Sequence, residues 1–404
     1  MVRRCPAQTA PASSRSVLDF CSNVSEMTAA VIQAFFVSAV RLLATVSSKK
    51  NTRLPNWLLF CLGSLPWLLS GCTENLERDV IVHATVDEQS AYPILNAFER
   101  TTDHETGVIA KFGVETTGSN GFVDRIVGTG DVPYADLFWD NEVMLTMRLQ
   151  KLGLLQPRRW EVSPNWPTDM IAGDGTWCGF AARARVLLIN TDLIPDASSR
   201  PDSVSELADP KWEQQCAIAS PLSGTTETHF AVLGERIGAA EMLTFARKVS
   251  QNAVVLPGSK RVARAVSAGR IAWGLTDSDH AMVESESGSP VAIVFPDQKP
   301  SQPGTLRIPN TVAILKGAPH PVAAGRLADY LISAQTEDRL AMGPSSQLPI
   351  NQGTQFPPAV LPNVPVRWMR VDFQAAAEGW NDTASKLAEI FAETGQALSP
   401  EAAD

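Results

Sequence analysis

Small polar and acidic residues follow several apolar runs of this 404-residue sequence, each at the point where the run ends. Four of them are carboxylates in two short groups, Asp140 with Glu142 and Asp277 with Asp279. Carboxylate oxygens are hard ligands that suit a metal cation, so these four residues are the candidate metal ligands. Where such a segment leads into a helix, the free backbone N–H groups of the helix N-terminus instead suit an anion.

The candidate ligand-binding residues lie in these segments or close to them. They are Thr85, Asp87, Ser119, Asn120, Asp140, Asn141, Arg183, Ser223, Gly224, Thr225, Thr276 and Asp277. Arg183 and the nearby Arg185 can meet an anion through their forked guanidinium groups, or they can pair with carboxylates between two lobes of the protein. Ser, Thr, Asp and Asn are also the ordinary N-cap residues of helices, which is the alternative interpretation of each segment taken singly. The four carboxylates exceed that need, because capping requires at most two of them.

Apolar runs with β-branched residues alternate with helical patterns along most of the chain. Strands are expected at 80–85, 108–114, 135–139, 185–190, 216–220, 253–257, 270–276, 291–295 and 311–315. Helices are expected from Pro93, after Ser119, and over 143–152, 226–237, 259–268, 321–333 and 382–395. This alternation predicts an α/β protein with parallel sheets. Ligands of open α/β sheets bind beyond the carboxyl ends of the strands, where the candidate residues lie.

Composition and motifs exclude several classes of function. The net charge is −9, and no stretch rich in Lys and Arg offers a surface for nucleic acid. There is no Gly-x-Ser-x-Gly motif, no P-loop, and no Gly-x-Gly-x-x-Gly after a strand. The five histidines lack the spacing of a zinc site. The sequence therefore shows no recognisable enzyme motif, although an enzyme that reuses the same fold stays open as the second class of function.

The N-terminal segment, residues 1–71, has the features of an export signal. A basic group around Lys49 and Arg53 precedes an apolar stretch over 54–69, which ends in Leu69-Ser70-Gly71-Cys72. This ending resembles the bacterial lipobox, so we expect Cys72 to become the lipid-modified first residue of the mature chain. Residues 1–48 then reflect either a start codon placed too early or a further membrane segment.

Removal of this leader changes the charge and the cysteine count. The leader contains seven Lys and Arg against two Asp and Glu, so the remaining 333 residues carry a net charge near −14. Part of this acidity falls in the candidate segments, which favours a cationic cargo. Cys178 and Cys216 are the two cysteines that remain after Cys72. In an exported protein they form either a disulfide or two buried free thiols.

Segments of the mature chain resemble the periplasmic solute-binding proteins of ABC importers, in the branch that includes the ferric-ion-binding proteins. The matching segments are 80–107, 134–157, 177–195, 207–226 and 308–333. The resemblance implies an α/β, two-lobed periplasmic-binding-protein fold with a hinged cleft (type II). Its lobes would comprise 79–182 plus about 296–345, and 183–295 plus about 346–398. Strands within 177–190 and 293–314 would cross between them.

The resemblance also implies a function. The protein would be a monomeric, lipid-anchored periplasmic receptor without an intrinsic cofactor that delivers a small solute to the membrane subunits of an ABC permease. The cargo would be ferric iron or another metal with a synergistic anion, the anion near Ser223-Gly224-Thr225 and a carboxylate ligand from Asp140-Asn141-Glu142. The adjacent tyrosines that hold iron in the family are replaced here by Thr276-Asp277-Ser278-Asp279. An organic phosphonate, thiamine or a polyamine is the alternative cargo, with Trp139 and Trp273 as cation–π faces for a cation.

Overall fold

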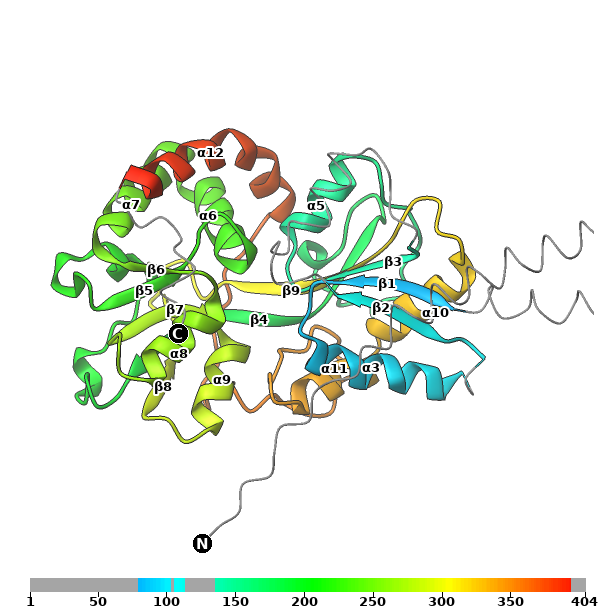
Figure 1. Ribbon diagram of the computed structural model, residues 1–404, viewed down its shortest axis with the longest axis horizontal. Coiled ribbons are helices and arrows are strands. Elements are labelled where there is room, and N and C mark those ends of the chain that lie inside the picture. The colour runs from blue at the N-terminus through cyan, green and yellow to red at the C-terminus, as the bar shows by residue number, and fades with distance from the viewer. Residues whose placement is uncertain (1–78, 103–104, 113–134, 394–404) are drawn as a thin grey trace, which may run out of the picture. The chain divides into compact units, whose positions relative to one another are not determined.

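The computed structural model describes residues 79–102, 105–112 and 135–393 (Figure 1). The expected leader with Cys72 and the two expected ligand residues Ser119 and Asn120 lie outside these ranges. Within them, no helix is both long enough and apolar enough to cross a membrane.

The first lobe is built on three short parallel strands in the order β2-β1-β3. They are β1 (Val80–Ala84), β2 (Val108–Phe112) and β3 (Leu137–Asp140). Helices on this side of the molecule in Figure 1 are α3 (Glu88–Thr101), α5 (Met144–Lys151), α10 (Pro321–Leu331) and α11 (Ala334–Met342). Apolar residues on one face of α3, such as Ile94 and Phe98, are buried in the core, as their spacing predicts.

The second lobe repeats this plan with strands in the order β7-β5-β6. They are β5 (Cys216–Ala219), β6 (Val254–Leu256) and β7 (Trp273–Asp277), again mutually parallel. Its helices are α6 (Gly224–Ile237), α7 (Ala239–Asn252), α8 (Ser259–Ser267), α9 (Ser278–Glu286) and α12 (Phe373–Glu393). The last of these, α12, packs against α6 and α7. Short 3-10 helices occur at Thr168–Met170, Ala197–Ser199, Val204–Ala208 and Pro210–Trp212.

Two long strands run between the lobes in Figure 1, β4 (Trp177–Asn190) and β9 (Arg307–Ile314). The first half of β4 pairs with β9, and its second half pairs with β7 and with β8 (Val291–Val294). All of these pairings are antiparallel, as is that of β9 with β3. The strands within each lobe are parallel, as expected, but the two strands that join the lobes, together with β8, make the sheet mixed.

A break in the regular pairing of β4 lies between the lobes, at Ala181. Its φ is +38°, and the register of β4 against β9 shifts between Phe180 and Ala182. A left-handed conformation is costly for a residue with a Cβ, so the surroundings must hold it in place. The buried Glu337 of α11 does so by accepting hydrogen bonds from the N–H groups of Ala181, Ile350 and Asn351. This bulge redirects the strand as it passes into the second lobe.

Cys178 and Cys216 do not form a disulfide. Both are free and buried. Cys178 lies on β4 opposite Val312 of β9, whereas Cys216 lies on β5 opposite Trp273 of β7. The two thiols are thus packed into strands of different lobes. Of the two expected alternatives, a disulfide or two buried free thiols, the structure has the free thiols. Burial raises the pKa of both thiols, that of Cys216 to about 12, so both stay protonated and unreactive in the folded protein.

Candidate ligand-binding site

The ends of β1 and β3 meet in the first lobe, where one hydroxyl joins them. Thr85 directly follows β1 and donates its hydroxyl to Asp140 Oδ1 at 2.5 Å. The hydroxyl oxygen of Thr85 in turn accepts a hydrogen bond from the N–H of Asn141 at 2.9 Å. β1 and β3 are adjacent parallel strands, so their carboxyl ends coincide, and three of the predicted residues form one cluster.

Asp140 and Glu142 form a pair of buried carboxyl groups in this cluster, with exposed fractions of 0% and 1%. Both oxygens of Glu142 accept backbone N–H groups of α5, from Met144 and Leu145. Asp140 Oδ2, in contrast, has no hydrogen-bond partner among the described residues. Burial raises the pKa of Asp140 well above its usual range, and the nearby Glu142 raises it further. A cation placed here would remove both penalties.

Asp277 at the end of β7 is neutralised by Arg185 on β4. Nη1 of Arg185 lies 2.5 Å from Asp277 Oδ1, and the hydroxyl of Thr225 donates to Asp277 Oδ2 at 2.7 Å. Arg185 also donates to the hydroxyls of Thr225, Thr226 and Ser259. Burial alone would raise the pKa of Asp277, but Arg185 and weaker contributions from His280 and Arg183 lower it to about 2. Asp277 therefore stays ionised as the counter-ion of a buried arginine.

Asp279 has a similar partner in Arg183, which lies two residues earlier on β4. Arg183 Nε is 3.0 Å from Asp279 Oδ2, and its Nη2 is 3.2 Å from the side-chain oxygen of Asn310. Its Nη1 donates to the backbone carbonyl of Asn141 in the first lobe. Of the two sequence interpretations of Arg183, the structure has the pairing with a carboxylate.

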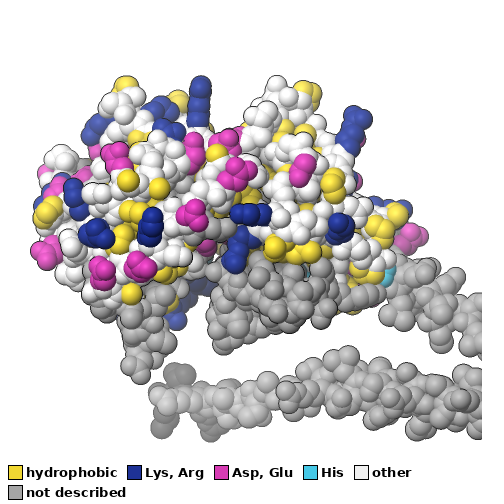
Figure 2. Space-filling view, turned by 90° about the horizontal axis from the view of Figure 1, so that it is seen from above, with side chains coloured by type: hydrophobic (Ala, Val, Ile, Leu, Met, Phe, Trp, Pro, Cys, Tyr) yellow, Lys and Arg dark blue, Asp and Glu magenta, His cyan; other side chains and the backbone are white. Residues whose placement is uncertain are grey.

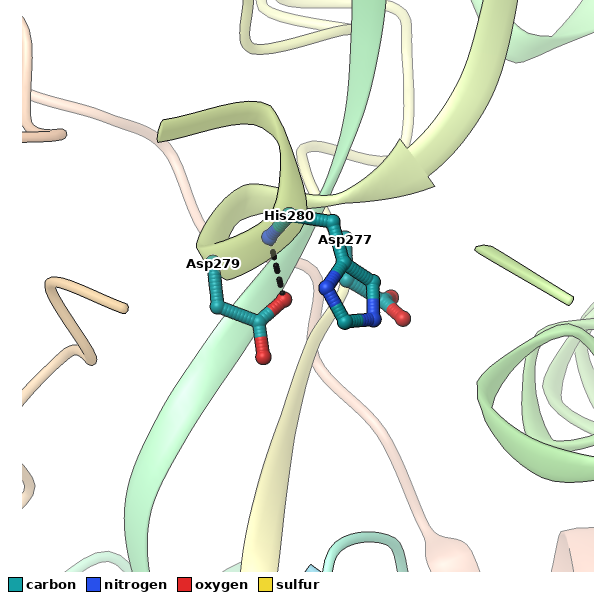
Figure 3. A group of neighbouring side chains, drawn as sticks. All are labelled: Asp277, Asp279 and His280. Atoms are coloured by element: carbon teal, nitrogen blue, oxygen red, sulfur yellow. Dashed lines mark hydrogen bonds between the residues drawn. The ribbon is translucent and has the colours of Figure 1, made fainter. Parts of the chain in front are cut away.

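Asp277, Asp279 and His280 also lie close enough together to share a metal ion, with one potential ligand atom from each within 4.8 Å of the others. Figure 3 shows Asp277 leaving the end of β7 while Asp279 and His280 begin α9. However, each carboxylate oxygen of this cluster already accepts a hydrogen bond, from Arg185, Thr225, Arg183 or the N–H of His280. A metal ion here would have to share or replace these donors, whereas Asp140 Oδ2 has none among the described residues, so Asp140 offers the better-prepared ligand.

The N-terminus of α6 lies beside the Arg185–Asp277 ion pair. Gly224 adopts φ +60°, and the side chain of Ser223, exposed at the N-cap position, makes no capping hydrogen bond. The first N–H groups of a helix have no partner within it, so they are available to an anion. The Arg185–Thr225–Thr226 contacts hold the first turn of α6 in place against β4.

The remaining predicted residues have other surroundings. Asp87 is exposed at the N-cap of α3, and the hydroxyl of Thr276 donates to the carbonyl of Ser259 at 2.7 Å. Trp139 and Trp273 are fully buried against Phe180 and Trp212, so they offer no cation–π face to a ligand.

A buried histidine of this region was not predicted from the sequence. His229 of α6 is buried, and neither of its ring nitrogens has a partner within the described part of the chain. Burial, with a smaller effect of Arg185, lowers its pKa to about 3, so its ring is neutral. No motif or spacing in the sequence marks it.

Two lobes joined by two connecting strands, with candidate residues at strand ends in both lobes, are the architecture of a solute-binding protein. Residues 131–376 match the family model described as bacterial extracellular solute-binding protein. The chain belongs to this family, which consists of solute-binding proteins and not of enzymes.

Particular relatives are iron-uptake proteins by name. Iron uptake protein A1 of Synechocystis sp. is 27% identical over 296 residues, which cover 68% of this chain and 79% of the relative. Iron uptake protein A2 of the same organism is 25% identical over 254 residues, or 59% of this chain and 71% of the relative.

Solved structures show the same fold. The apo ferric ion-binding protein A of Pasteurella haemolytica superimposes with a TM-score of 0.67 at 20% identity, over 78% of this chain and 98% of that one. Trichodesmium IdiA (FutA), in complex with iron and citrate ligands, superimposes with a TM-score of 0.65 at 20% identity, over 77% of this chain and 99% of that one. The resemblance stated from the sequence and the two-lobed fold class are therefore confirmed.

Proposed function

We propose that this protein is the substrate-binding lipoprotein of an ABC importer and that its cargo is ferric iron carried with an anion. The proposed lobes are 79–182 plus about 296–345 and 183–295 plus about 346–398. The iron would bind Asp140 of the first lobe. The anion would bind the N-terminus of α6 in the second lobe and complete the metal's coordination.

The observation that carries this proposal is the carboxylate of Asp140, which is fully buried, next to Glu142, and has one oxygen without a partner among the described residues. Leaving a buried acceptor unpaired is unfavourable unless a ligand pairs with it. A hard trivalent cation is such a ligand, and the named relatives are iron-uptake proteins.

The second lobe explains why an anion belongs in the proposal. No tyrosine stands at the end of β7, and the carboxylates there are neutralised by Arg183 and Arg185. The end of β7 and the N-terminus of α6 therefore present neutral ion pairs and helix N–H groups. These groups suit the oxygen atoms of a chelating anion better than a bare cation. The ion pairs also occupy both arginines, which disfavours a free organic phosphonate.

A ligand panel with thermal unfolding tests the cargo. Ferric citrate at about 100 times its Kd should stabilise the full chain by about 2.7 kcal/mol, because it binds only the folded state. Citrate alone should have a much smaller effect. A shift with thiamine, spermidine or an aminoalkylphosphonate, without one for ferric citrate, would reject iron as the cargo.

Lipid anchoring has a separate test in the bacterial cell. Cys72→Ser removes the thiol that the lipobox would modify, so the protein should leave the membrane fraction. A chain with Cys61→Ser in the apolar stretch is the matched control and should stay with the membrane. An unchanged distribution of the Cys72→Ser protein would contradict the lipoprotein assignment.

The face of the molecule in Figure 2 gives no support for a nucleic-acid-binding function. Figure 2 shows Lys and Arg side chains interspersed with Asp and Glu over the face that it displays. A mixed surface of this kind lacks the single-sign stripe that binds a nucleic-acid backbone.

A further inference from the structure

Two direct contacts join the lobes through the segment Asp140–Glu142, and neither involves cargo. Glu142 Oε2 accepts a hydrogen bond from the hydroxyl of Thr228 on α6 at 2.7 Å. Arg183 donates to the carbonyl of Asn141. Both contacts lie within two residues of Asp140, so the position of this candidate ligand depends on them.

The carboxylate of Glu142 is fixed within the first lobe before it meets the second. Its two oxygens accept the N–H groups of Met144 and Leu145 at 2.6 and 2.9 Å, at the start of α5. The hydroxyl of Thr228 adds a donor from α6, and both side chains are buried, at 1% and 0% exposure. When the lobes separate, water can replace this donor. When they are together, no other side chain of the second lobe among the described residues donates to Glu142.

Arg183 makes the second contact from a rigid position. Asp279 and the Asn310 side chain hold its guanidinium, and Asn310 in turn donates to the carbonyl of Ala181 at the bulge of β4. The contact to Asn141 is thereby connected to the place where β4 passes from one lobe to the other.

We infer that Thr228 and Arg183 are positioning residues that hold the lobes together in the absence of cargo and so set the affinity of the cleft. The affinity part of this inference rests on the proposed function, whereas the effect on the lobes does not. The apparent Kd rises in inverse proportion to the fraction of molecules in the binding arrangement. Removing a donor from a buried carboxylate lowers that fraction, because the separated arrangement regains the donor from water.

Thr228→Val and Thr228→Ser distinguish the effect of the hydroxyl from that of the methyl group. Valine replaces the hydroxyl with a methyl group, whereas serine keeps the hydroxyl and lacks the methyl group. Spin labels are introduced as a reactive non-canonical amino acid at Val322 of α10 and Val283 of α9, which are 72% and 47% exposed and belong to different lobes. In the cargo-free full chain, Thr228→Val should shift the distance distribution between the labels toward separated lobes. Thr228→Ser should match the wild type. The Kd for ferric citrate should rise about tenfold or more for Val and little for Ser.

An unchanged label distance in Thr228→Val would overturn the inference. Thr228→Ala, which removes the hydroxyl without adding a methyl group in its place, repeats the test, and thermal unfolding verifies that each variant folds. If ferric citrate does not bind at all but Val and Ala shift the labels while Ser does not, the proposed cargo is wrong and the positioning role stands.

Discussion

Replacement of Asp277 by alanine is expected to lower the free energy of unfolding by about 3–5 kcal/mol, the usual cost of breaking a buried ion pair. The side chain of Arg185 is fully buried and would keep only hydroxyl partners, from Thr225, Thr226 and Ser259. Arginine cannot shed its proton at a pH where proteins fold, so its charge would remain unbalanced in the core. Chemical denaturation of the cargo-free protein measures the loss.

This stabilisation also has a defined pH range. The folded-state pKa of Asp277 is near 2, below the value of about 3.9 that an aspartate has in an unfolded chain. The contribution of the ion pair is therefore fully present above about pH 4 and is lost as the pH falls toward 2. The wild-type protein should lose more stability over that range than Asp277→Asn does.

The matched control removes both charges at once. Arg185→Met combined with Asp277→Leu should recover much of the lost stability, since an apolar pair of similar volume often replaces a buried ion pair without loss. If Asp277→Ala alone stays within about 1 kcal/mol of the wild type, Arg185 does not depend on this carboxylate. The same dependence makes Asp277→Ala a poor probe of metal binding, because loss of folding would imitate loss of a ligand.

The strand ends that carry the candidate site could be predicted because their signals are local. Thr85, Asp140 and Asp277 follow short apolar runs, and the structure places them after β1 and at the ends of β3 and β7. Chain order and the strand–helix alternation suffice to bring such ends to one edge of a sheet.

The partners of those residues could not be predicted in the same way. Arg185 and Asp277 are 92 residues apart, and Arg183 and Asp279 are 96 apart. Their pairing depends on the antiparallel register of β4 against β7, which places Arg185 opposite Asp277. The sequence pattern predicted parallel strands and therefore carried no information on that register. Asp277 and Asp279, which the sequence pattern indicates as metal ligands, are therefore counter-ions of the two arginines.

The prediction of helices and their boundaries was incomplete for a related reason. α3 begins at Glu88 and contains Pro93 in its interior, although proline is typical of the first turn. α9 was not expected at all, since it buries only Ser278, Asp279 and Ala281 and so has no apolar stripe with helical spacing. Tertiary packing determines both elements more than their own sequence does.

Asp140→Asn should separate cargo binding from stability. We expect the affinity for ferric citrate to fall at least about 100-fold, since even residues that only support a metal ligand typically account for 10- to 100-fold. The carboxamide oxygen can still accept the hydroxyl of Thr85, and the like charge beside Glu142 disappears. The free energy of unfolding without cargo should therefore stay the same or rise. Isothermal titration and chemical denaturation of one preparation measure both quantities.

Asp192→Asn is the control, because this exposed aspartate follows β4 outside the candidate site and carries the same change of charge. It should leave both affinity and stability unchanged. If Asp140→Asn keeps its affinity, the positive charge of the cargo is met elsewhere in the cleft. If it instead loses several kcal/mol of stability, Asp140 is a structural acid whose partner lies within the protein. The predicted combination, weaker binding with no loss of stability, is what distinguishes a ligand residue from a residue of the fold.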